Sequence, residues 1–224
     1  MVLDWIIMNK EPLKVIYGLL IVFICSIIVL KSDRLFKLSD YQGIRYFRNA
    51  FFFYGVAFTI RFILGTKILR DMFYSEILVS ILFEFFIITA GLLLFYSLIW
   101  KGVEKKKKYN SLFNLNTGII YIVSLFLSWG DFLLKTNLLM FFSQILLFLG
   151  MVFLSYQNYL KRRKINSFVK YHFLSFFLGL IAWILNFLVS FFLNWNKSLQ
   201  ILIYSLNIIF FLLFLYGTNK ISGD

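Results

Sequence analysis

Two charged residues, Arg61 and Glu84, lie inside long apolar runs of the 224-residue sequence and are the first candidates for chemistry. If these runs are membrane helices, an ionised side chain near a helix centre costs about 2.5–3.5 kcal/mol and usually faces a partner inside the bundle. A rise of about 1.5 Å per residue puts both residues roughly 8 to 12 Å from the same end of a helical hairpin. They could therefore coordinate a ligand or relay protons, or instead form a buried ion pair that fixes the register of two helices.

Three uncharged polar residues share this predicted depth. Gln144, Asn186 and Asn207 each fall about seven or eight residues from the corresponding end of an apolar run. With the two charged residues they would form a polar layer that could bind a ligand. Each amide could instead hydrogen-bond between helices, an interaction worth under about 2 kcal/mol. Trp183 lies in one of the same runs and either packs in the core or lines a pocket.

The composition shows which kind of element must position these residues. Hydrophobic residues make up 61% of the chain and charged residues 15%. Soluble domains are closer to one half apolar and one quarter charged. A soluble domain of this length could not bury so much Phe, Leu and Ile. The sequence therefore predicts an all-α, polytopic membrane protein.

The apolar runs divide the chain into helices. A hydrocarbon core about 30 Å thick needs roughly 20 apolar residues of helix. Seven segments meet or approach this length, which predicts a single seven-helix domain over residues 1–224. A six-helix alternative would drop the second or the fourth segment. The predicted helices are 12–31, 49–66, 76–100, 112–129, 137–156, 172–193 and 199–217.

Basic residues alternate along the connections and predict the orientation of the chain. The first, third and fifth connections are rich in Lys and Arg, whereas the others carry few, so the N-terminus is expected outside and the C-terminus inside. The net charge of +13 is thus assigned to anionic head groups of the bilayer rather than to nucleic acid. Four consecutive lysines in the third connection are candidates for binding anionic lipid: Lys105, Lys106, Lys107 and Lys108.

The sequence contains no recognisable catalytic or metal-binding motif. It has one cysteine, Cys25, and one histidine, His172, so no disulfide can form within the chain and no Cys/His metal site is expected. No zinc-protease, nucleophile-elbow or phosphate-loop pattern is present. We therefore expect neither an enzyme nor a cofactor.

The stretch from Gln42 to Phe53, QGIRYFRNAFFF, resembles the start of the second helix in archaeal-type seven-helix membrane modules. Those modules are uncharacterised or precede sensor kinases. The resemblance extends at most to Leu64. We expect no cytoplasmic output domain after the seventh segment, so the resemblance implies a sensing or signal-relaying bundle that needs a separate cytoplasmic partner.

These observations predict a receptor-like, multi-pass protein of the cell membrane. It would bind a small ligand in an outer-half pocket formed by the polar layer and pass helix shifts to the basic inner loops. Two alternatives stay open. The first is a small secondary transporter with Glu84 as the proton-coupled carboxylate. The second is a non-catalytic, lipid-organising or assembly protein in which the polar layer only packs helices.

Overall fold

The computed structural model describes residues 10–39, 41–65, 76–103, 112, 115–162, 167–192 and 197–222. Within these ranges the regular elements are all helical, and seven helices are long and apolar enough to cross a membrane. This confirms the predicted all-α class and the seven segments, and it includes the second and fourth segments, one of which a six-helix alternative would drop. The elements are α2 (Lys10–Ser39), α3 (Gln42–Thr59) with its π-helical continuation η1 (Ile60–Leu64), α5 (Glu76–Val103), α6 (Leu115–Leu134), α7 (Leu138–Arg162), α8 (Ser167–Phe191) and α9 (Lys197–Ser222).

Several helices continue beyond the apolar runs that predicted them. The first was expected to end at residue 31 but runs to Ser39, and the second was expected to begin at residue 49 but begins at Gln42. Arg45 and Arg48, which the sequence placed in a connection, are therefore helical. Lys and Arg are good helix formers whose long side chains can carry the charge away from an apolar surface. Hydropathy thus marks the apolar part of a helix and not its end.

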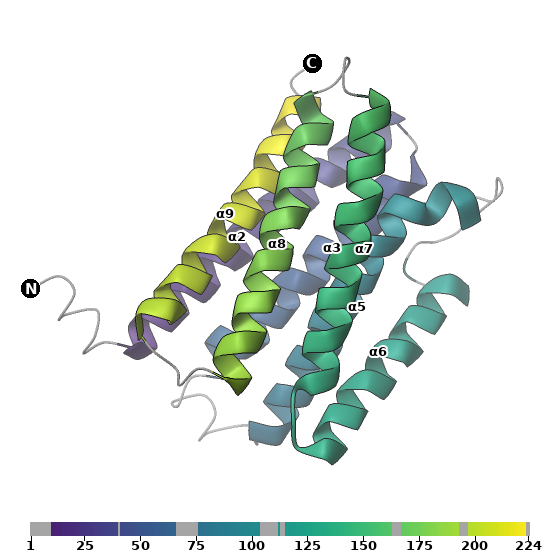
Figure 1. Ribbon diagram of the computed structural model, residues 1–224. Coiled ribbons are helices and arrows are strands. Elements are labelled where there is room, and N and C mark those ends of the chain that lie inside the picture. Colours follow the sequence, from purple (N-terminus) through teal and green to yellow (C-terminus); the bar gives the residue numbers. More distant parts are fainter. Residues whose placement is uncertain are drawn as a thin grey trace, which may run out of the picture.

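Six of the helices form a closed ring, with the seventh outside it. Around the ring α2 packs against α3, α3 against α5, α5 against α7, α7 against α8, α8 against α9, and α9 against α2. Helix α6 packs on α5 and α7 at the edge of the bundle (Figure 1). This arrangement leaves an interior that side chains from six helices can fill or line.

Aromatic side chains fill one half of that interior. The ring of Phe214 lies 5.1, 5.2 and 5.0 Å from those of Phe51, Phe176 and Phe210, and each of these phenylalanines is almost fully buried. Aromatic pairs at such distances contribute about 0.5–1.5 kcal/mol beyond the area that they bury. This cluster closes the half of the ring nearer the chain's C-terminus, which we call the C-terminal end.

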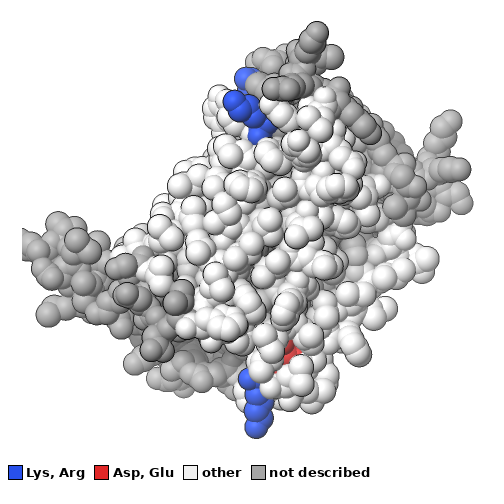
Figure 2. All heavy atoms as spheres, viewed as in Figure 1, with Lys and Arg blue, Asp and Glu red and all other residues white. Residues whose placement is uncertain are grey.

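The outer surface of the bundle is apolar between its two ends. Figure 2 shows Lys and Arg only near the ends of the face in view and almost no charge between them. Large apolar side chains on the outside of different helices are more than two-thirds exposed, among them Leu30, Ile122, Phe126 and Leu146. Such extensive apolar exposure is typical of a surface that contacts lipid or another protein. With the seven long helices, it suggests a multi-pass membrane protein.

Candidate ligand-binding cavity

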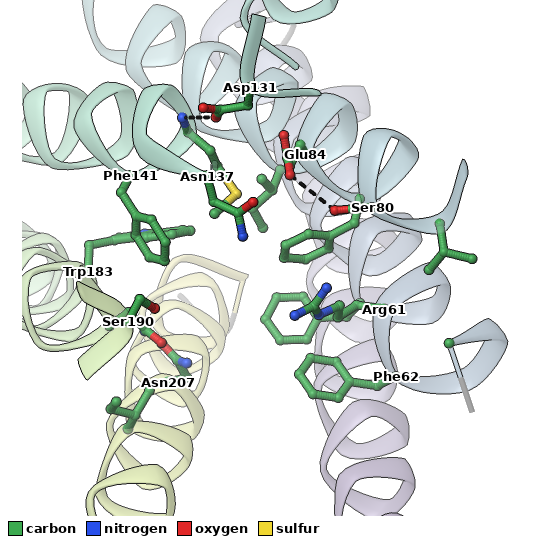
Figure 3. Close-up of a pocket in the computed structure, with 18 of the residues that line it drawn as sticks. Arg61, Phe62, Ser80, Glu84, Asp131, Asn137, Phe141, Trp183, Ser190 and Asn207 are labelled. Carbon is green, nitrogen blue, oxygen red and sulfur yellow. Dashed lines mark hydrogen bonds between the residues drawn. The ribbon is translucent and has the colours of Figure 1, made fainter. Parts of the chain in front are cut away.

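The other half of the ring encloses a cavity of about 1260 Å³, lined by residues from all seven helices. It lies where α2 begins and where α6 turns into α7, and we call this the cavity end. Pockets for small organic molecules usually measure about 300–1,000 Å³. The cavity is therefore large enough for such a molecule. In Figure 3 its polar side chains face one another across the space, with Arg61 and Glu84 on one wall and Ser190 and Asn207 on the other.

Arg61 lies on η1, where the helix of α3 widens into a π-helical turn. The backbone N–H of Gly65 donates to the carbonyl of Ile60 at 2.9 Å, five residues back. Turns of this kind are frequent at functional sites, because the extra residue turns side chains out of the α-helical register. The guanidinium of Arg61 points into the pocket (Figure 3) and lies 5.2 Å from the centre of the Phe83 ring, a cation–π contact.

Glu84 is 4% exposed and lies on α5 in the wall of the same cavity. The hydroxyl of Ser80, one turn earlier on α5, donates to its Oε1 at 3.2 Å. Its Oε2 is enclosed and has no hydrogen-bond partner. Buried polar atoms are nearly always paired in native proteins, so an unpaired carboxylate oxygen beside a cavity needs an explanation.

The ion pair that was one of the two interpretations of Arg61 and Glu84 is not formed. Both residues line the cavity, yet no salt bridge joins them in the described part of the chain. Arg61 packs instead over Phe83, the residue before Glu84. Counting residues from the helix ends therefore placed both residues in the correct half of the bundle. It could not fix the rotation of each helix, which decides whether the two charges touch.

Asn207 belongs to a network on the α9 wall. Its amide donates to the hydroxyl of Tyr17 on α2 at 3.1 Å. The Tyr17 ring stacks on Tyr204 with centroids 4.1 Å apart, and the Gln200 amide donates to the Tyr204 hydroxyl at 2.8 Å. These contacts connect α2 and α9 and fix the orientation of four polar side chains at the cavity.

The other two predicted amides differ in position. Asn186 lines the cavity, and its amide donates to the carbonyl of Ala182 on its own helix at 2.9 Å. Gln144 is fully buried outside the cavity lining, and its amide donates across to the carbonyl of Ile87 on α5 at 3.2 Å. Four members of the predicted polar layer therefore line one cavity, whereas Gln144 connects α7 to α5.

Asp131 was not among the residues predicted for the site, because the fourth helix was predicted to end at residue 129. Helix α6 continues to Leu134, and Asp131 is 1% exposed in the cavity wall. Its carboxylate accepts the backbone N–H groups of Leu139 at 2.9 Å and Met140 at 2.7 Å, in the first turn of α7. These donors would otherwise be unsatisfied, so Asp131 caps α7 although it lies on another helix.

Aromatic side chains make up much of the cavity wall. Phe141 and Trp183 meet edge to face at 6.0 Å between α7 and α8. The hydroxyl of Tyr54 is buried at the cavity without a hydrogen-bond partner. A few polar groups set among aromatic surfaces are typical of pockets for small organic ligands. Trp183, for which the sequence left two roles open, lines the pocket.

The described residues contain no group of three or more His, Cys, Asp and Glu side chains that could hold a metal ion. Cys25, on α2, is buried. The four lysines proposed to bind lipid, Lys105 to Lys108, lie outside the described residues. The cavity wall offers charged groups, hydrogen-bonding groups and aromatic surface.

An uncharacterised protein of Archaeoglobus fulgidus is 29% identical to this chain over 102 residues. The match covers 41% of this chain and 45% of that protein, so the chain spans less than half the length of this relative. No protein family and no solved structure was found to match the chain. The predicted resemblance is thus supported as far as an uncharacterised archaeal protein, and the association with sensor kinases finds no support.

Proposed function

We propose that this protein is a receptor-like, multi-pass protein of the cell membrane that binds a small ligand in the cavity described above. The observation that carries the proposal is the cavity itself. It gathers Arg61, Glu84, Asn186 and Asn207 from separate helices at one end of the bundle. Binding sites between membrane helices commonly gather polar side chains in this way, since such residues are costly anywhere else in the membrane.

The described basic residues support the proposed orientation in the membrane. Arg34, Lys37, Lys170 and Lys220 lie toward the C-terminal end, where α2 and α9 finish and α8 begins. Positively charged residues favour the cytoplasmic side. The cavity would then open to the outside, as a receptor for an external molecule requires. The lysine tract at 105–108 would lie on the inner side and bind anionic lipid.

A ligand would act by changing how the helices around the cavity pack. Each wall belongs to a different helix, so a bound molecule that contacts several walls favours one arrangement of the ring over another. Those helices end at the inner side, where a separate cytoplasmic partner would detect the shift.

The first experiment measures access to the cavity. A membrane-impermeant maleimide is added to right-side-out or to inside-out vesicles containing Asn207→Cys. The matched control is Ile209→Cys, two residues away on α9 and 45% exposed on the outer surface. We expect labelling of Asn207→Cys from the outside and none of Ile209→Cys, because lipid excludes the charged reagent. Equal labelling at both positions, or at neither, would contradict the proposed pocket. Native Cys25 is buried and gives the background.

A proton-coupled secondary transporter is the second candidate, and one observation favours it. Glu84 Oε2 is buried without a partner, as expected of a carboxyl group that takes up and releases a proton. The same labelling experiment separates the two candidates. A transporter opens to each side in turn, so Asn207→Cys would then be labelled from both sides of the membrane.

A further inference from the structure

Arg61 is a cation that the described part of the protein leaves without an anion. Its guanidinium has five N–H donors, none of which is accepted by a described residue, and its described contact is the face of Phe83. A guanidinium binds a carboxylate through two parallel hydrogen bonds, and this geometry gives both energy and specificity. Arg61 is exposed, so a ligand with a carboxylate group would take the place of water at these donors.

Glu84 is an acidic residue of the same cavity that lacks a hydrogen-bond donor at one of its oxygens. One of its oxygens accepts from Ser80, and the other is enclosed and unpaired. An ammonium group drawn to this carboxylate would supply the missing donor. Because Oε2 is enclosed, the side chain must rotate slightly to meet a ligand.

The two charges are kept apart although they are close enough to share a pocket. The Arg61 guanidinium lies over the ring of Phe83, the residue before Glu84 on α5, and no salt bridge joins it to Glu84. We propose that the cavity binds an amphoteric small molecule, with its carboxylate on Arg61 and its ammonium group on Glu84. This inference rests on the proposed ligand-binding function and assigns the class of ligand.

A ligand with a single charge fits the site less well. A simple anion on Arg61 would bring negative charge toward Glu84, and a simple cation on Glu84 would bring positive charge toward Arg61. Charges across an interface favour binding when each meets its opposite. Three other charged residues also line the cavity. Asp131 is engaged by two N–H groups of α7, and Lys14 and Lys135 lie toward the cavity end of α2 and at the α6–α7 corner.

The walls indicate an apolar body between the two charged groups. Phe58, Phe141 and Trp183 line the space around the charged pair, and Tyr54 offers a hydroxyl without a partner at greater depth. Aromatic surfaces bury an apolar or aromatic body and orient it by edge-to-face contacts. An amino acid with an aromatic side chain is the simplest probe of this class.

Four probes with the same phenethyl body test the assignment. They are phenylalanine with both charges, phenethylamine with the ammonium alone, hydrocinnamate with the carboxylate alone, and phenethyl alcohol with neither. Binding to the full chain in detergent is measured by calorimetry at pH 7. We expect phenylalanine to bind about tenfold more tightly than either singly charged probe, the ratio that about 1.4 kcal/mol gives.

Two variants assign each charge to its residue. In Arg61→Met, phenylalanine should bind no better than phenethylamine. In Glu84→Gln, it should bind no better than hydrocinnamate. Arg34→Met is the matched control, since it removes an exposed arginine at the C-terminal end, outside the cavity lining, and should leave the ranking of the probes unchanged. The ranking in the unaltered protein needs no variant, so a variant that fails to fold does not weaken the test.

The outcomes separate the inference from the proposed function. If a singly charged probe binds as tightly as phenylalanine, the amphoteric assignment is wrong. If all four probes bind with equal affinity, the cavity binds small molecules without distinguishing their charges. The inference then fails and the proposed function stands. If none binds, both fail.

Discussion

The two ends of the helix bundle use their charged side chains differently. At the C-terminal end, Arg48 on α3 pairs with Asp33 on α2, and Lys31 donates to Asn219 on α9. At the cavity end, Arg61 and Glu84 line the same space without pairing. Charges at the first end join neighbouring helices, whereas these two are left available to something else. The difference suggests where the molecule is held together and where it binds.

Asp131 is the exception at the cavity end, because its carboxylate is used to cap α7. We expect Asp131→Ala to give the largest loss of stability, about 2–3 kcal/mol, since two buried N–H groups lose a charged acceptor. Thermal unfolding in detergent measures it. Thr136→Ala is the control, because its hydroxyl lies 3.5 Å from the same carboxylate and contributes little. If Asp131→Ala lost no more stability than Thr136→Ala, the cap would not be needed for folding.

Gln144 tests whether the predicted amides act together. A Cβ added at Gly91 on α5 would lie 2.6 Å from its Oε1, so Gly91→Ala must displace the buried amide. We expect a cost of about 1–2 kcal/mol from this overpacking. The matched control is Gly118→Ala on α6, where nothing lies within 4 Å of the added Cβ and helix propensity favours alanine. Ligand binding should be unchanged in both, and a selective loss of affinity in Gly91→Ala would return Gln144 to the binding site.

The ion pair of the C-terminal end should contribute less. The Arg48 and Asp33 side chains are 21% and 35% exposed, so solvent screens their attraction. A double-mutant cycle with Arg48→Met and Asp33→Asn should give a coupling energy of about 0.5–1 kcal/mol. Lys37, bridged to the same carboxylate at 3.2 Å but 75% exposed, is the control and should couple more weakly. If both pairs gave the same coupling energy, the pair between α2 and α3 would stabilise the protein no more than the exposed pair within α2.

The sequence predicted what depends on hydropathy and missed what depends on helix rotation. Seven apolar runs give seven helices, and counting residues from their ends placed four of the five polar-layer residues at one cavity. The same counting put Gln144 in that layer, although it faces α5 instead. Nothing in a single run of Phe and Leu specifies which way its polar residue turns.

A signal for Asp131 was present in the sequence all the same. The buried residues of α6 recur at helical spacing, and four of the five are polar. Extending that stripe by one turn past the apolar run reaches the carboxylate. A prediction based on the helical spacing of these residues, and not on hydropathy alone, would therefore have extended the fourth helix beyond residue 129. The buried stripe is Thr117, Ile120, Ser124, Ser128 and Asp131.

The smallest coupling energy is expected between Arg61 and Glu84, and measuring it tests the difference between the two ends most directly. Since no salt bridge joins them, Arg61→Met and Glu84→Gln should be nearly additive in thermal unfolding, with a coupling below about 0.5 kcal/mol. Glu84→Gln alone should cost little, because an amide removes the charge and keeps an acceptor for Ser80. A coupling at least as large as that of Arg48 with Asp33 would mean that the two charges pair in the working protein. They would then tie α3 to α5 as the C-terminal end ties α2 to α3, and the cavity would lose the separated charges on which the ligand assignment depends.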